Sequence, residues 1–159
     1  MQVNTVVKIL DWFYVHRVFF KFRGKPIKAT LITDECWLEG FTYTKYEITK
    51  NSVTITQSVT GEYRSEKNTA VVDIDDSYLN ELADVFRHKF KRTDSVFDVE
   101  DASDESVVIT NALKIKYHYS GMPWDLNSVP GYREFKNRLY ELIPQYMEDI
   151  NDEIMKESR

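Results

Sequence analysis

The hydrophobic period of the chain changes from two residues to 3.6 residues at Ser77, and this change constrains the fold most. Residues 77–92 place apolar side chains at every third or fourth position, which is typical of an amphipathic helix. Before Ser77, β-branched and alternating segments are separated by turn residues. These predicted strands span residues 27–33, 40–49, 53–60 and 70–74, with a polar link over 61–69. Short strands joined by turns and followed by a helix favour an α+β fold with an antiparallel meander.

Further elements are predicted on both sides of this region. Upstream, we expect a helix up to about Tyr14 and a half-buried strand over 18–22. Downstream, alternation returns as a strand over 107–119, and helical spacing over 129–157 predicts a long C-terminal helix kinked at Pro144, because proline removes a helix hydrogen bond. We therefore expect one α+β domain over residues 1–159, a mainly antiparallel sheet of five to six strands with two principal helices packed on it.

Composition agrees with an ordinary globular chain. The 159 residues are 42% hydrophobic, which is enough for one core without disulfides or a structural metal. The single Cys36 cannot form an internal disulfide, and Lys8, Asp11 and Arg17 interrupt the apolar N-terminal run. We expect a soluble, cytoplasmic protein that does not associate with a membrane.

The net charge of −5 is distributed unevenly along the chain. Residues 1–92 carry 14 Lys and Arg against 12 Asp and Glu, whereas residues 93–159 carry 7 against 14. The most acidic stretch, TDSVFDVEDASDES over residues 93–106, has six acids and no base, and it is predicted to be a mobile loop.

Motifs that specify metal, cofactor or nucleophilic chemistry are absent from the sequence. The three histidines are far apart, Cys36 has no second cysteine, and no glycine-rich phosphate loop or GxSxG sequence occurs. Asp73, Asp75 and Asp76 precede the helix predicted from Ser77, where carboxylates cap free N–H groups. We expect no metal, no cofactor and no catalytic residues.

Two basic segments are the candidate binding elements. The segment HRVFFKFRGKPIK, residues 16–28, interleaves cations with phenylalanines, and RHKFKR, residues 87–92, closes the predicted helix. The candidate binding residues are Arg17, Lys21, Arg23, Lys25, Lys28, Arg87, Lys89, Lys91 and Arg92. Each segment also has a structural interpretation, as the solvated face of a strand and as cations at the negative end of a helix dipole.

The function expected from these features is binding without catalysis, and a protein is the favoured kind of partner. Three alternatives stay open. In the first, the chain is a nucleic-acid-binding module that uses residues 16–28 and 87–92. In the second, it is a small acidic inhibitor that imitates nucleic-acid charge. In the third, it is an enzyme whose site assembles only in the fold. The nucleic-acid alternative requires the two basic segments to adjoin in space.

Overall fold

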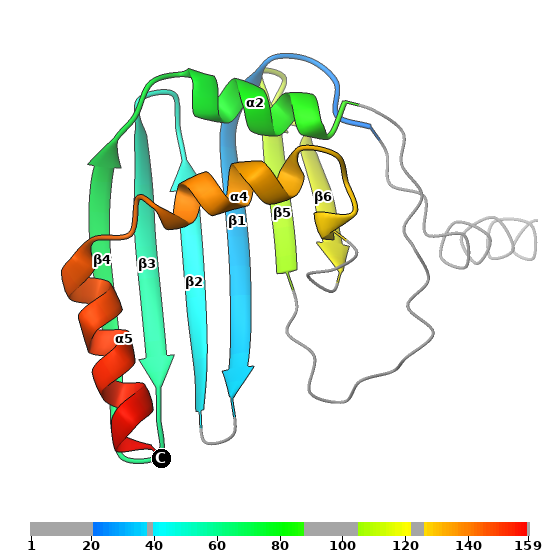
Figure 1. Cartoon of the computed structure of the whole chain (residues 1–159). Coiled ribbons are helices and arrows are strands. Elements are labelled where there is room, and N and C mark those ends of the chain that lie inside the picture. Colours follow the sequence, from blue (N-terminus) through cyan, green and yellow to red (C-terminus); the bar gives the residue numbers. More distant parts are fainter. Residues whose placement is uncertain (1–20, 38–39, 88–104, 122–125, 159) are drawn as a thin grey trace, which may run out of the picture.

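A computed structural model describes residues 21–37, 40–87, 105–121 and 126–158, and at its centre lies a six-stranded antiparallel sheet (Figure 1). The strands follow the order β4-β3-β2-β1-β5-β6, so the expected α+β meander is confirmed. Their bounds are β1 Pro26–Trp37, β2 Gly40–Ile48, β3 Ser52–Thr60, β4 Ser65–Asp73, β5 Glu105–Asn111 and β6 Lys116–Gly121.

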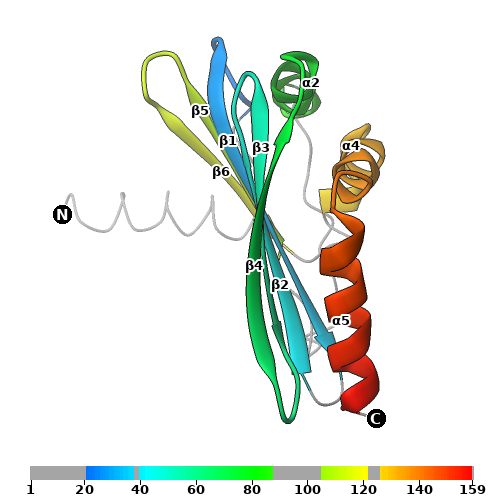
Figure 2. The ribbon, with the colours of Figure 1, turned by 90° about the vertical axis from the view of Figure 1, so that its left-hand side faces the viewer.

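Three described helices lie on one face of this sheet (Figure 2). They are α2 Ser77–Val85, α4 Tyr132–Tyr140 and α5 Gln145–Glu157. Because successive strand residues point to opposite faces, alternate side chains such as Leu31, Ile55 and Ile109 are buried beneath the helices. Leu82 and Phe135 meet them from α2 and α4, and these buried side chains belong to one hydrophobic cluster.

Two strand predictions are wrong in extent. β4 begins at Ser65, inside the predicted polar link, because this edge strand is solvated and polar residues occupy it without cost. The predicted strand over 107–119 is a hairpin. Asn111 ends β5, since its side-chain Oδ1 accepts hydrogen bonds from the N–H groups of Leu113 and Ile115, each at 3.0 Å. Lys114 then reverses the chain with a positive φ of 62°.

The predicted strand over 18–22 is not observed in its described part, because Lys21 and Phe22 have no strand pairing. Residues 18–20 and the helix predicted up to Tyr14 lie outside the described residues. Of the predicted acidic loop, residues 93–104 also lie outside them. Glu105 and Ser106 form the start of β5, so the loop prediction is wrong there.

The helix predictions differ from the structure at their ends. α2 stops at Val85, and Phe86 leaves the helical conformation with φ −94° and ψ 8°, while residues 88–92 lie outside the described residues. The predicted kinked C-terminal helix is two helices, because Pro144 adopts an extended conformation with φ −61° and ψ 141°. This break restarts the helical phase, so α5 buries Met147 and leaves Tyr146 exposed.

The turn between β3 and β4 packs against the C-terminal end of α5. A Cβ atom on Gly61 would lie 2.5 Å from Ser158 Oγ, so only glycine fits this approach. Ser158 Oγ also accepts a hydrogen bond from Glu62 N at 3.2 Å, and Arg64 pairs with Glu153 at 3.0 Å. These contacts hold α5 against the β4 side of the sheet.

Candidate functional site

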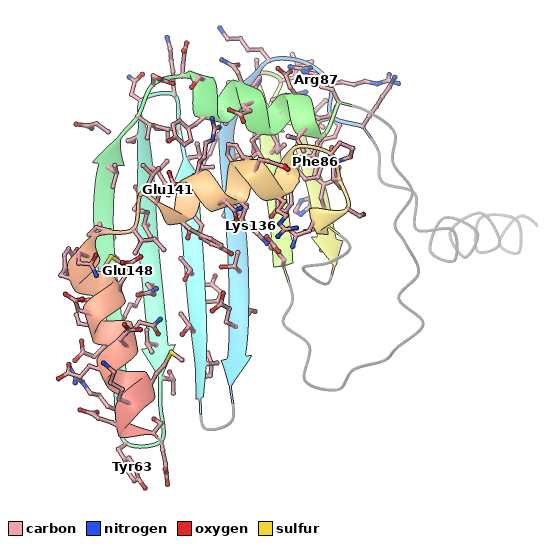
Figure 3. All side chains as sticks on the ribbon, viewed as in Figure 1. Tyr63, Phe86, Arg87, Lys136, Glu141 and Glu148 are labelled. Carbon is pink, nitrogen blue, oxygen red and sulfur yellow. The ribbon has the colours of Figure 1, made fainter. Side chains whose placement is uncertain are left out.

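Residues 21–25 lie against the C-terminal end of α2, where Figure 3 labels Phe86 and Arg87. Phe22 N donates a hydrogen bond to the carbonyl oxygen of Phe86 at 2.7 Å. Arg87 donates from Nη2 to the carbonyl oxygen of Gly24 at 3.0 Å, and from Nε to Asp84 Oδ1 at 2.7 Å. The described parts of the two basic segments therefore adjoin.

The β5–β6 turn adds further cations to the same end of the sheet. Asn111 Nδ2 donates to the carbonyl oxygen of Arg23 at 3.1 Å, and Ala112 N donates to that of Lys25 at 2.8 Å. Strand register places Lys28 beside Thr110 and Thr110 beside Lys116. We call this surface the basic corner, and its cations are Lys21, Arg23, Lys25, Lys28, Arg87, Lys114 and Lys116.

Acidic side chains neutralise only part of the basic corner. Lys28 Nζ lies 3.3 Å from Glu47 Oε1, and Arg87 is paired with Asp84 as described above. Hydrogen bonds from Lys45 and Lys28 hold the pKa of Glu47 below its ordinary value. Counted over the described residues, the corner therefore carries more positive than negative charge.

Aliphatic side chains are exposed among these cations. Leu113, at the tip of the β5–β6 turn, is 79% exposed, and Ile27 and Ile115 are exposed beside it. Phe22, by contrast, is only 2% exposed. Its ring lies under the Arg87 guanidinium, 5.2 Å from ring centroid to Cζ, and meets Tyr117 edge-on.

The candidate residues predicted from the sequence divide into two groups. Lys21, Arg23, Lys25, Lys28 and Arg87 all belong to the basic corner. The remaining candidates, Arg17, Lys89, Lys91 and Arg92, lie outside the described residues. Lys114 and Lys116 were not among the candidates, because residues 107–119 read as one strand and the turn at Asn111 was not recognised.

Apart from the basic corner, the structure contains a cluster of buried charged and polar side chains, which we call the buried charge cluster. It consists of Glu105, Tyr132 and Lys136. Lys136 reaches from α4 toward β5, and its Nζ lies 3.1 Å from Glu105 Oε2 (Figure 3). The Lys136 and Glu105 side chains are 8% and 1% exposed. The Tyr132 hydroxyl donates to the other oxygen of Glu105. Burial, together with the Glu105 charge, raises the pKa of Tyr132 well above its ordinary value.

This cluster was not predicted from the sequence, although the sequence carries two signals of it. Glu105 is in phase with the buried Val107 and Ile109 of β5, and Lys136 lies in the apolar stripe of α4. Both oxygens of the carboxylate already accept hydrogen bonds, so the cluster is arranged as a fixed ion pair that ties α4 to the sheet.

Tyr46 and Tyr140 lie near this cluster, with ring centroids 6.3 Å apart. Burial raises the pKa of both tyrosines above the ordinary value. The Tyr46 hydroxyl is buried and makes no hydrogen bond in the described part of the chain. Such a group lowers stability relative to a ring without the hydroxyl.

α5 lies at the other end of the molecule from the basic corner (Figures 1 and 2), and its sequence is rich in acidic residues. A shallow depression there is lined by Asp149, Asp152, Glu153, Lys156 and Glu157. At the start of α2, Asp75 Oδ1 accepts a hydrogen bond from Ser77 N at 2.8 Å, which supports the capping interpretation for this carboxylate. The N-cap residue itself, Asp76, makes no side-chain capping bond, so the interpretation is wrong for Asp76. Hydrogen bonds from the side chain and from the N–H of Ser77 lower the pKa of Asp75.

Among residues 21–37, 40–87, 105–121 and 126–158, no three His, Cys, Asp or Glu side chains lie together as a metal site would require. No helix within these ranges has the length and hydrophobicity needed to cross a membrane. Comparison with known protein families, with curated proteins and with solved structures finds no match to this chain.

Proposed function

We propose that the chain binds a protein partner through the basic corner. The observation that carries this proposal is the exposure of Leu113 at the tip of a turn whose neighbours are lysines. Apolar side chains within a charged rim are the arrangement of protein interfaces, where a few buried anchors dominate the affinity. The matching segment of the partner carries acidic residues together with apolar ones.

The exposed apolar atoms favour a protein over a nucleic acid. Single-stranded nucleic acid binds where aromatic rings stack on bases, and Phe22, a ring of the basic segment, is buried. Among the described residues, the exposed apolar side chains at the corner are instead aliphatic, as Leu113 and Ile115 are. The net charge of −5 also opposes the approach of a polyanion.

The contact of Arg87 with residues 21–25 favours a second candidate, nucleic-acid binding, because phosphates are bound by cations alone. The test therefore titrates the protein against three labelled probes by fluorescence anisotropy. They are a short peptide of alternating Glu and Leu, the same peptide with Ser in place of Leu, and a single-stranded oligothymidylate of equal charge. We expect the Glu-Leu peptide to bind at least about tenfold more tightly than either other probe.

Variants of the corner separate the contributions of charge and apolar contact. Leu113→Ser and Lys116→Glu are each expected to weaken the binding of the Glu-Leu peptide about tenfold. Lys156→Glu on α5 changes the net charge equally and serves as the matched control, with unchanged affinity expected.

Three results contradict the proposal. One is no peptide binding tighter than about 10⁻⁴ M. Another is micromolar oligothymidylate binding that falls steeply with salt and is unaffected by Leu113→Ser, which establishes the nucleic-acid alternative. The third is binding of the corner to vesicles containing phosphatidylserine while both peptides fail to bind.

A further inference from the structure

β4 is a long and regular edge strand. Its nine residues, SEKNTAVVD, contain no proline or glycine and pair with β3 without a register shift. Figure 2, viewed from the β4 side, shows no other described element in front of this strand. Proteins usually protect such edges by shortness, proline, a bulge or charged side chains, and β4 has only the charged side chains, in Glu66, Lys67 and Asp73.

The main-chain groups on the open edge of β4 belong to its odd-numbered residues. Ile74 N donates to the carbonyl oxygen of Asn51 at 3.0 Å, and Gly61 N donates to that of Arg64 at 2.8 Å. In an antiparallel ladder, hydrogen-bonded pairs alternate with unbonded ones, so the even-numbered residues from 64 to 74 bond to β3. The N–H and C=O groups of residues 65, 67, 69, 71 and 73 therefore point away from the sheet.

The side chains of these odd-numbered residues are exposed, and they are complementary to themselves. If a second copy pairs antiparallel with Ala70 on the two-fold axis, Lys67 lies opposite Asp73 of the second copy, and Asp73 lies opposite its Lys67. Neither Lys67 nor Asp73 forms an ion pair within the described part of the chain. Val71, which is 66% exposed, then covers Thr69 of the second copy.

We propose that β4 pairs with β4 of a second copy of this chain in this register, which joins two sheets into one across a two-fold axis. Every outward main-chain group of residues 67–73 then acquires a partner, because odd-numbered residues lie opposite odd-numbered ones. Edge pairing buries less surface than a standard interface, so the dimer is weak. The basic corner lies toward the opposite edge and stays accessible (Figure 1).

Analytical ultracentrifugation of the full chain tests this pairing. We expect a monomer–dimer equilibrium with a dissociation constant of about 10⁻⁵ to 10⁻⁴ M. Lys67→Asp and Asp73→Lys each place like charges opposite one another, and each is expected to weaken the dimer about tenfold or more. The double variant exchanges the charges and restores the dimer. Lys50→Asp, at an exposed lysine outside β4, makes the same charge change as Lys67→Asp and has no effect.

A second variant tests the main-chain pairing itself. Thr69→Pro removes an outward N–H and the exposed hydroxyl contact between Thr69 and Thr56 at 3.4 Å, but no main-chain bond to β3, so the monomer folds and the dimer is lost. The circular dichroism spectrum verifies the fold. The proposal is overturned by a protein that stays monomeric up to about 1 mM, by a double variant that fails to restore association, or by dimers that tolerate Thr69→Pro.

Discussion

Phe86 lies where α2, α4 and β6 meet, and it shows how single side chains hold this fold together. Its ring stacks on Tyr119 with centroids 4.2 Å apart and meets Tyr132 edge-on at 5.7 Å. Phe86→Ala is expected to lower the free energy of unfolding by about 3 to 5 kcal/mol, because it leaves a cavity at this junction. Urea denaturation measures the loss.

Tyr146→Ala is the control for this prediction, because Tyr146 is an exposed aromatic on α5. Its expected cost is below about 1 kcal/mol. If Phe86→Ala lowers the free energy of unfolding as little as Tyr146→Ala does, the apolar face of α2 is not part of the core.

Lys136 and Glu105 are predicted to be strongly coupled. Lys136→Met leaves the Glu105 carboxylate buried without its cation, so we expect a loss of about 3 to 5 kcal/mol in unfolding free energy. Adding Glu105→Gln to that variant removes the uncompensated charge and recovers much of the loss. A double-mutant cycle measured by denaturation gives the coupling, and additive single effects would contradict it.

At the level of secondary structure, the sequence predicted the elements that have one buried face. β2 and β3 were predicted almost to the residue, since each alternates cleanly between buried and partly exposed positions. β4 was predicted too short, because an edge strand need not alternate in polarity. Five of the seven cations of the basic corner were candidates from the sequence. The other two, Lys114 and Lys116, were not, since they join the corner only where the β5–β6 turn meets residues 21–25, and no local pattern encodes that contact.

The β5–β6 turn carries a strain that a substitution should relieve. Lys114 has a φ of 62°, a conformation that costs a residue with a Cβ atom about 1 kcal/mol. Lys114→Gly is expected to raise the free energy of unfolding by about 0.5 to 1 kcal/mol, measured by thermal or urea denaturation. Lys116→Gly, within β6, is the control and is expected to destabilise. Equal losses in the two variants would contradict this account of the turn.

For the whole molecule, a basic surface and an acidic surface lie at opposite ends of the described structure. The basic corner occupies the end of the sheet near the C-terminus of α2, and the acidic surface of α5 lies at the other end (Figure 1). This arrangement would orient any charged molecule that approaches before contact, an effect that salt screens.

Stability of the whole molecule is expected to fall at alkaline pH because buried tyrosines must stay neutral. Burial raises the pKa of Tyr46 and Tyr132 above the ordinary value, whereas in the unfolded chain they ionise near a pKa of about 10. Their contribution is complete below that pH. Above it the unfolded state binds fewer protons, so each tyrosine removes about 1.4 kcal/mol of stability per pH unit.

Tyr46→Phe isolates one of these two contributions. It is expected to reduce the alkaline slope by about 1.4 kcal/mol per pH unit. Stability at neutral pH should hold or rise, since the lost hydroxyl makes no hydrogen bond in the described part of the chain. Urea denaturation across the alkaline range measures both effects, and a slope unchanged by Tyr46→Phe would contradict this assignment.

The strand order also has a consequence for how the chain folds. β1 to β4 follow one another in both sequence and space, so this part forms through short turns, whereas β1 pairs with β5 across a long stretch of chain. During synthesis β1 to β4 emerge before β5. Until the β5–β6 hairpin has been made, the edge of β1 that pairs with β5 has no partner. A nascent chain at that stage has two unpaired sheet edges and is the species most exposed to aggregation.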